Sequence, residues 1–255
     1  MKPIMLTIGL LGAALLCAGG QARGIVPDHS ITRAVADPAR PEADRARDTE
    51  RKPAESLAFA GVHPGEKVAE LLPGGGYFTR LFSLVVGPKG KVYARVRARQ
   101  PQAAPDSPDP GAPIQAIAAD PHYGNVVVST MSIKELSLPE PVDLVWTSQN
   151  YHDLHNIPDG DVAAFDKAVF DALKPGGVFI VLDHVAAAAS GFRDTSTLHR
   201  IDPEAVKKEV LSAGFKFEAA SEVLHNAADD HTLKVFDPAI RGKTDQFILK
   251  FRKPK

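Results

Sequence analysis

The chain has 255 residues, 44% of them hydrophobic, and its formal net charge at pH 7 is −1. A chain of this length and composition can bury a substantial core, so we expect one enzyme-sized domain. The near-zero charge provides no global positive field, which argues against nucleic acid and anionic lipid as partners. Small molecules and proteins remain as classes of partner.

The first 22 residues have the pattern of a signal peptide. Lys2 gives a positive start, residues 4–16 form an apolar run too short for a comfortable membrane span, and small residues stand just before position 23. We expect residues 1–22 to be removed and the mature protein, without a membrane span, to be periplasmic or secreted. Cys17 is the only cysteine and lies in this segment, so the mature chain would have no disulfide, thiolate metal site or catalytic thiol.

The expected mature chain divides into an N-terminal arm, residues 23–54, and one domain, residues 55–255. The arm is rich in Arg, Asp, Pro and Ala and has few large apolar residues, which predicts a lead-in segment with one short helix. The domain is expected to begin with a helix over residues 55–62, which Gly61 and Pro64 bring to an end.

Residues 68–83, VAELLPGGGYFTRLFS, predict a buried strand that ends near an acid, a glycine turn and the start of an amphipathic helix. Gly74, Gly75 and Gly76 permit positive φ and close backbone approach, so free amides at the helix start would face a ligand. A plain strand-to-helix turn explains the glycines equally simply. Glu70 favours the ligand, because a carboxylate just before the glycines suits a cofactor that carries an amine.

Two other kinds of nucleotide loop do not match this turn. The Gly-Lys-Ser/Thr ending of phosphate-binding loops is absent, and Thr79 stands where a dinucleotide fingerprint has its third glycine. Together with Glu70, Thr79 therefore disfavours a nicotinamide-dependent oxidoreductase.

The rest of the domain alternates strands with helices, which predicts a parallel sheet with right-handed crossovers. Strands are expected over residues 67–72, 91–96, 125–129, 143–147, 178–183, 216–223 and 246–252. Helices are expected over residues 77–86, 159–173 and 203–213, the last with Asp202 as N-cap and Gly214 as its stop. Residues 100–113 are rich in proline and are expected to form a surface loop, as a flexible insertion rather than a ligand for a partner.

These motifs resemble the class I S-adenosylmethionine-dependent methyltransferases, whose first strand ends in an acid followed by a Gly-x-Gly turn. Residues 136–154, LSLPEPVDLVWTSQNYHDL, are similar to the fourth strand of that family, and residues 173–184, LKPGGVFIVLDH, to its turn and fifth strand. Residues 199–215 are similar to the late helix that precedes an antiparallel closing hairpin. Taken whole, the chain is similar to a group of bacterial methyltransferases with a signal peptide that are predicted from sequence and functionally uncharacterised.

The resemblance implies an α/β fold with a Rossmann-like, seven-stranded, mostly parallel sheet, an antiparallel closing strand and helices on both faces. It also implies that the chain uses S-adenosylmethionine to methylate a small acceptor. The residues that it assigns to the cofactor are Glu70, Gly74, Gly75, Gly76, Ser132, Ser148 and Asn150.

The polar segment after the fourth strand would lie beside the reacting methyl group. His152 and Asp153 are the candidate catalytic residues there, since an imidazole next to a carboxylate can deprotonate an acceptor or orient it. The alternative is that Asp153 caps the following turn and His152 is only a residue at the rim of the pocket.

Two positions depart from the family pattern. The second strand ends in Arg95, Val96 and Arg97, without the carboxylate that commonly binds the ribose, and Ser132 replaces the usual aspartate at the adenine position. Either the ribose contacts come from elsewhere, or the chain is an exported, non-enzymatic domain that binds a ligand or a protein with the same fold. Arg95, Arg97 and Arg99 offer an anion contact, although a solvated strand end explains them more simply.

A polar segment, residues 224–246, is expected to fold over the mouth of the pocket. It contains the metal-ligand types His225, Asp229, Asp230 and His231, but spacing within a loop does not establish a converging geometry, so no metal site is predicted. His231, Arg241 and Lys243 are candidate substrate contacts, with loop stabilisation as the equal alternative.

Overall fold

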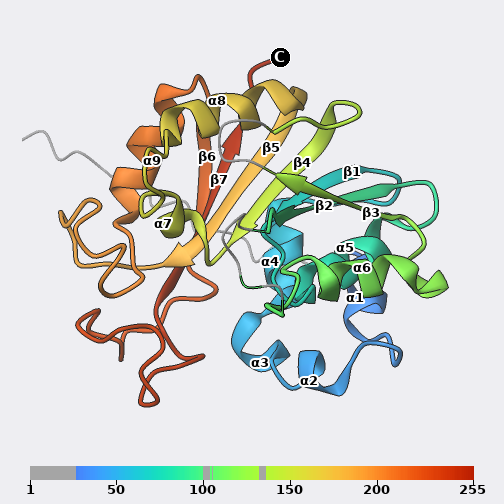
Figure 1. Cartoon of the computed structure of the whole chain (residues 1–255), viewed down its shortest axis with the longest axis horizontal. Helices are drawn as coiled ribbons and strands as arrows, with labels where there is room; N and C mark the ends of the chain where they lie inside the picture. The colour runs from blue at the N-terminus through green and yellow to red at the C-terminus, as the bar shows by residue number, and fades with distance from the viewer. Residues whose placement is uncertain (1–26, 100–103, 105, 132–135) are drawn as a thin grey trace, which may run out of the picture.

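The computed structural model describes residues 27–99, 104, 106–131 and 136–255. Its centre is a seven-stranded sheet in the order β3-β2-β1-β4-β5-β7-β6 (Figure 1). The strands are β1 (Lys67–Leu71), β2 (Lys91–Arg97), β3 (Val126–Met131), β4 (Val142–Ser148), β5 (Leu173–His184), β6 (Lys216–Ser221) and β7 (Gln246–Arg252). The first five strands pair in parallel, and β7 runs antiparallel to both β5 and β6. The predicted fold class is therefore confirmed.

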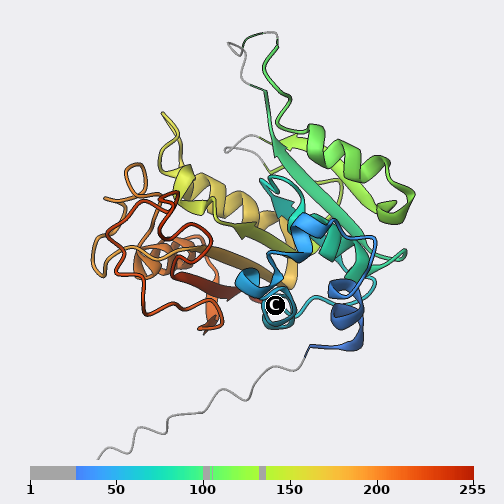
Figure 2. The same cartoon turned by 90° about the horizontal axis from the view of Figure 1, so that it is seen from below.

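Helices cover both faces of the sheet (Figures 1 and 2). One face packs against α1 (His29–Val35), α4 (Pro53–Ala60), α5 (Tyr77–Val86) and α6 (Ala112–Ala119). The other face packs against α7 (Tyr151–Leu154), α8 (Val162–Ala172) and α9 (Pro203–Ser212). The remaining helices are α2 (Glu42–Arg45), α3 (Asp48–Arg51) and the short 3₁₀ turn η1 (Pro121–Tyr123).

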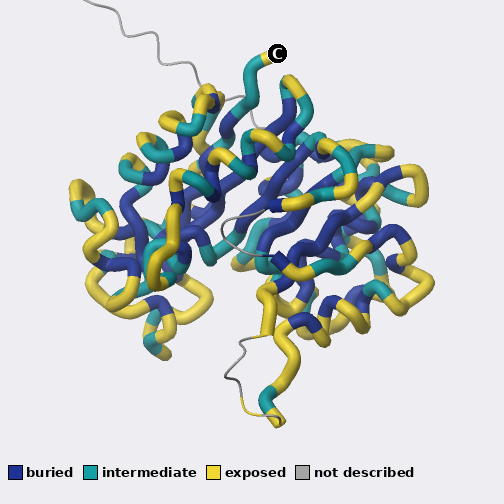
Figure 3. The backbone as a smooth tube through the Cα atoms, turned by 45° about the horizontal axis from the view of Figure 1, so that its top comes forward, coloured by how far each residue is buried: buried dark blue, intermediate teal, exposed yellow. Residues whose placement is uncertain are grey.

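The two hydrophobic cores follow from the alternation of side chains along each strand. In β4, Leu144 and Trp146 enter the core beneath α5, whereas Val145 enters the core beneath α8 and α9. Both faces of the central strands are covered, which explains why their sequences are almost continuously apolar rather than alternating. The buried backbone in Figure 3 accordingly runs along the central strands, and the exposed backbone lies in the surrounding loops.

The predicted elements agree with the structure to within a few residues at most ends, and three differences have clear causes. β5 begins at Leu173 because that residue already pairs with Val142 of β4. α6 and α7 were not expected, since α6 follows a proline-rich stretch and α7 is only one turn long. The helix predicted over residues 55–62 begins earlier, at Pro53.

The prediction of one short helix in the N-terminal arm is wrong, because three helices, α1, α2 and α3, precede α4. Asp28 caps α1 by accepting from the amides of Ser30 and Ile31 at 2.7 and 3.1 Å. Buried Arg40 pairs with Asp48 of α3 through two bonds of 2.9 and 2.7 Å, which stabilises the turn between α1 and α3. Polar bonds therefore shape this arm together with the burial of Ile31 and Ala34 of α1 in the core.

Two of the predictions fall outside the described residues. These are the signal peptide over residues 1–22 and the adenine contact of Ser132. Export and the role of Ser132 therefore stay predictions.

Across the part of the chain that the structure describes, none of the helices has the length and apolar character needed to cross a membrane.

Candidate functional site

The candidate site lies at the carboxyl ends of β1 and β4, where the strand order reverses. The chain passes from β1 to β2 and β3 on one side and then crosses to β4 on the other side of β1. Loops diverge at such a point and leave a crevice, which is the usual ligand site of an open parallel sheet. A cavity of about 330 Å³ opens here, and its lining includes Arg51, Glu70, Gly74, Gly75, Tyr77, Ser148 and Asn150.

The three glycines of the loop after β1 have different roles. A Cβ added to Gly74 or Gly75 would meet no atom within 4 Å, so both backbones are open to close approach from the cavity that they line. Gly76 has a φ of 83° and is buried, and its added Cβ would lie 2.1 Å from Cδ1 of Ile117. Gly76 therefore serves the packing of α6 against the start of α5, and its predicted contact with a cofactor stays a prediction.

Glu70 is the buried acid of this site. Its side chain lies at the end of β1 with 3% of the residue exposed, and its Oε2 accepts a hydrogen bond of 2.5 Å from Oγ1 of Thr79. Burial raises the pKa of Glu70 to about 7, although the bond from Thr79 and the charge of Arg51 act in the opposite direction. The carboxyl group therefore gains or loses its proton near neutral pH, according to the charge of whatever occupies the cavity.

Arg51 brings a cation from the arm to the same cavity. Its Nη2 donates to Oε1 of Gln149 at 2.6 Å, and its guanidinium lies 4.8 Å from the ring centre of Tyr77. Burial and nearby Arg47 lower the pKa of Arg51 to about 10, so it stays charged at neutral pH. Sequence analysis missed Arg51, because nothing in a polar arm indicates which arginine turns inward.

The arm is attached to α5 by polar contacts of two acids that precede Arg51, Asp44 and Asp48. The hydroxyl of Tyr77 donates to Oδ1 of Asp48 at 2.6 Å, and Arg80 pairs with Asp44 at 2.9 Å. Because Tyr77 and Arg80 belong to the helix that follows the glycine loop, these contacts place the arm directly over the cavity.

Ser148 and Asn150 reach the cavity from the end of β4, as predicted. The side-chain amide of Asn150 donates from Nδ2 to the backbone carbonyls of Leu72 and Ser148 at 3.1 and 3.0 Å. It thereby connects the loop after β1 to the end of β4. Leu72 has a φ of 52°, in the left-handed region that glycine favours, so this connection maintains an uncommon backbone shape.

A second cavity of about 420 Å³ adjoins the first. The two share Arg47, Arg51 and Gln149 in their linings, and the second also includes His184, Phe236 and Arg241. Burial lowers the pKa of His184 to about 4, so its imidazole is neutral, and its Nδ1 lies 2.8 Å from Oγ1 of Thr244. This cavity thus combines three arginines with one acid, Glu50, and neutral polar groups.

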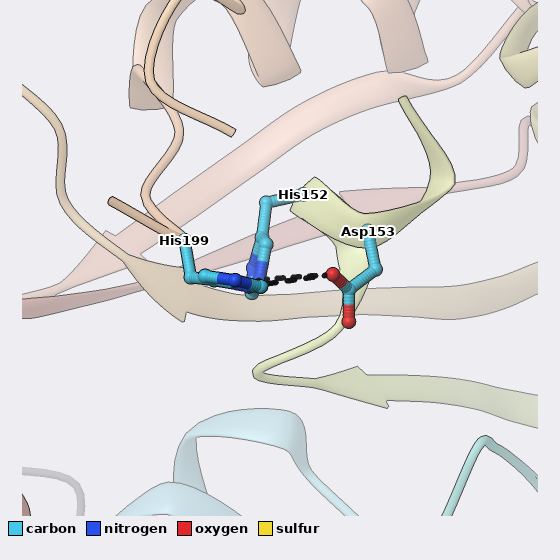
Figure 4. Close-up of side chains that lie close together, drawn as sticks. All are labelled: His152, Asp153 and His199. Carbon is cyan, nitrogen blue, oxygen red and sulfur yellow. Dashed lines mark hydrogen bonds and ion pairs between the residues drawn. The ribbon is translucent and has the colours of Figure 1, made fainter. Parts of the chain in front are cut away.

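His152 and Asp153 lie close together on α7, and His199 completes a cluster with them (Figure 4). His152 Nε2 is 3.2 Å from His199 Nδ1 and 3.4 Å from Asp153 Oδ1. On its other side, His152 Nδ1 is 2.8 Å from Oδ1 of buried Asp183. Burial alone disfavours a charged His152, but the carboxylate of Asp183 outweighs it, so the pKa of His152 is raised.

The cluster borders the second cavity, since the ring of His199 lies 4.9 Å from that of Phe236. His152 is only 2% exposed, whereas the side chains of Asp153 and His199 are 35% and 23% exposed. The acid–base role of His152 and Asp153 stays a prediction, with Asp153 and His199 the members that a ligand can reach. Sequence analysis did not connect His199 with this cluster, because it is distant in the chain.

The segment over residues 224–246 is held by two ion pairs of its own and by one with Arg200, which lies outside it. Arg200 pairs with Asp229 at 2.9 Å, and the two oxygens of Asp245 lie 3.0 and 2.9 Å from ring nitrogens of His225 and His231. His231 therefore has a structural partner. Of the three candidate substrate contacts in this segment, the second cavity includes Arg241.

The second strand carries no carboxylate over Lys91–Arg97, as its sequence shows. Arg95 is buried beside the first strand, and its Nη1 donates to Oγ of Ser129 at 2.5 Å. Arg95 is therefore part of the packed sheet, whereas Arg97, the last residue of β2, and Arg99 are exposed, as expected of a solvated strand end.

No protein-family model and no curated protein matches the chain, so the comparison rests on solved structures. The solved structures with the same architecture include S-adenosylmethionine-dependent methyltransferases. The chain shares the fold of these structures. A methyltransferase from Aquifex aeolicus aligns with a TM-score of 0.58 and 19% identity over 83% of this chain and 95% of its own.

Two further structures share the fold. The [4+2]-cyclase SpnF aligns with a TM-score of 0.58 and 18% identity, covering 86% of this chain and 85% of its own. The glycopeptide N-methyltransferase MtfA aligns with a TM-score of 0.55 and 15% identity, covering 82% of this chain and 90% of its own. Because a structure described as a cyclase shares it, the fold alone does not determine the reaction.

Proposed function

We propose that the chain binds S-adenosylmethionine in the 330 Å³ cavity and transfers its methyl group to a small polar acceptor in the adjoining cavity. The observation that carries the proposal is that buried Glu70 and Arg51 line the same cavity, beside the two open backbones of Gly74 and Gly75. An amino-acid zwitterion needs an anion for its ammonium group and a cation for its carboxylate, and this cavity supplies both. The shared fold supports the same proposal.

The residues present fit the amino-acid end of the cofactor. Glu70 would accept from the ammonium group, Arg51 would donate to the carboxylate, and the backbones of Gly74 and Gly75 would allow close approach. The ribose end has no acid on β2, where Arg95 is used within the sheet. Ribose contacts from another part of the chain are therefore part of the proposal.

S-adenosylmethionine, when bound, supplies an electrophilic methyl carbon. The chain would bind the acceptor in the second cavity, where three arginines against the single acid Glu50 favour a molecule with an anionic group. His199 contacts Phe236 of that cavity's lining, Asp153 lies beside His199, and the two would orient an acceptor or accept its proton. Most of the rate enhancement in such a reaction comes from alignment and the exclusion of water, which two adjoining cavities beneath the arm favour.

Calorimetric titration with S-adenosylmethionine and with its demethylated product tests the cofactor. We expect binding to release a proton at pH 6, because an ammonium group beside Glu70 lowers a pKa that burial holds at about 7. The observed enthalpy should then depend on the ionisation enthalpy of the buffer at pH 6 and lose that dependence above pH 8. Absence of binding would contradict the proposal.

Glu70→Gln is the matched variant for this titration. It keeps the shape of the side chain and should weaken binding by about 1.5–3 kcal/mol, the scale of a hydrogen bond to a charged group. Proton release should disappear with it. Equal affinity of the variant and the wild type would remove Glu70 from the site.

Transfer itself is tested with S-adenosylmethionine labelled on the methyl group and an extract of the host. We expect His152→Ala and Asp153→Ala to lower labelling by roughly 100-fold while cofactor affinity changes little, which is the scale of a lost general base. Equal labelling by all three proteins would exclude both residues from the chemistry. Binding without any labelled product would instead favour a non-enzymatic binding domain, for which the missing ribose acid is the supporting observation.

A further inference from the structure

The cluster of His152, Asp153 and His199 has the donor geometry of a metal site. Each residue offers one ligand atom, and the three atoms lie 3.2, 3.4 and 3.5 Å from one another. Ligands at about 2.0–2.1 Å from a tetrahedral ion lie about 3.3–3.4 Å apart, whereas neighbouring ligands of an octahedral ion at about 2.1 Å lie about 3.0 Å apart. The observed triangle therefore matches one face of a tetrahedron.

A second observation concerns the orientation of His152. Its Nδ1 is 2.8 Å from Oδ1 of Asp183, a residue with no exposed surface. A carboxylate that accepts from Nδ1–H leaves Nε2 with its lone pair directed at His199 and Asp153, and metal-bound histidines are commonly oriented in this way. The backbone amide of His152 also donates to Asp183 at 2.8 Å, so one carboxylate holds both the backbone and the imidazole of His152.

The site also remains accessible. The side chains of Asp153 and His199 are 35% and 23% exposed, and His199 contacts Phe236 at the edge of the second cavity. An ion held by three protein ligands keeps a position for water or for a substrate oxygen, which is the pattern of catalytic rather than structural zinc sites.

We propose that His152, Asp153 and His199 bind one divalent transition-metal ion, with Zn²⁺ the best match to the two imidazoles, one carboxylate and tetrahedral spacing. This site is additional to the cofactor cavity and does not depend on methyl transfer. The competing explanation for the same contacts is a hydrogen-bond network in which a proton lies between the two imidazoles.

The test is to measure metal binding to the full chain. The protein should carry no added histidines and should first be freed of metal by a chelator. Titration with Zn²⁺ should give one ion per chain, and Co²⁺ should give the intense visible absorption of a tetrahedral site. Asp153→Asn and His199→Asn should each weaken binding at least tenfold. His199 has a φ of 56°, which asparagine adopts readily, so the variant should keep the backbone.

His231→Asn is the matched control. His231 also has a left-handed backbone, with a φ of 64°, and also contacts a carboxylate, that of Asp245 at 2.9 Å. His225 contacts the other oxygen of Asp245, but among the described residues these side chains do not form a converging group of three ligand atoms, so Zn²⁺ binding should be unchanged in this variant. Zinc should also raise the unfolding temperature of the wild type and of His231→Asn, but not that of His199→Asn.

Two kinds of result would overturn the proposal. One is a wild type that binds no Zn²⁺, in which case the contacts are the hydrogen-bond network. The other is binding that does not follow the cluster. If the wild type, Asp153→Asn and His199→Asn bind Zn²⁺ equally, or if His231→Asn loses as much affinity as His199→Asn, the ion lies elsewhere. Each result is read from metal binding, so it is independent of whether S-adenosylmethionine binds.

Discussion

Replacing Arg200 by methionine is expected to destabilise the fold by about 3–5 kcal/mol, the cost of removing one partner from a buried ion pair. The side chains of Arg200 and Asp229 are 0% and 1% exposed, and their closest atoms are 2.9 Å apart. Arg200 also donates to the carbonyls of Val185 and Leu233 at 3.0 and 2.9 Å. The substitution leaves a carboxylate and two carbonyls without this donor.

Urea denaturation of the wild type and of Arg200→Met measures this loss. The double variant Arg200→Met with Asp229→Leu is the control, and it should recover part of the stability because it removes the buried charge as well. If Arg200→Met alone unfolds at the same midpoint urea concentration as the wild type, the pair of Arg200 and Asp229 does not hold residues 224–246 in place.

Glu70→Gln is expected to stabilise the ligand-free protein by up to roughly 3 kcal/mol at pH 8, the equivalent of a pKa raised from 4.5 to about 7. The folded state binds the proton of Glu70 more tightly than the unfolded state. Wild-type stability from this group is therefore present below pH 4.5 and is lost as the pH rises to about 7. Glutamine carries no such proton, so its contribution is constant with pH.

Free energies of unfolding at pH 5 and pH 8 provide the measurement. The free energy of unfolding should decrease less between pH 5 and pH 8 in Glu70→Gln than in the wild type, and the difference should be up to roughly 3 kcal/mol. A decrease that is the same in both proteins would mean that Glu70 ionises as freely in the fold as in the unfolded chain. The same substitution weakens the proposed cofactor contact, so stability and binding would change in opposite directions.

Local pattern predicted the sheet well because each central strand is buried on both faces and therefore reads as an apolar run. β7 begins and ends at the predicted residues, and α5 matches its prediction as well. For α5, a glycine turn precedes an amphipathic repeat and another glycine follows it. Such signals lie within a few residues of the element that they define.

The candidate site was predictable only where its residues lie next to such signals. Glu70 lies near the carboxyl end of β1 and Asn150 just after that of β4, so their place at one end of the sheet could be inferred from the topology. Arg51 and His199 have no such neighbour. Arg51 reaches the cavity because Asp48 and Tyr77 hold the arm on α5. His199 contacts His152 because the loop between β5 and α9 brings it to α7.

The burial of Trp146 gives the molecule an optical reporter of its own. It is the only tryptophan in the sequence, it is 0% exposed, and its Nε1 makes no hydrogen bond to any described residue. Its indole lies 4.8 Å from the ring of Phe78, which lines the 330 Å³ cavity. Intrinsic fluorescence excited at the indole therefore arises from one apolar position beneath the glycine loop, so occupancy of the cavity and unfolding can both be followed without a label.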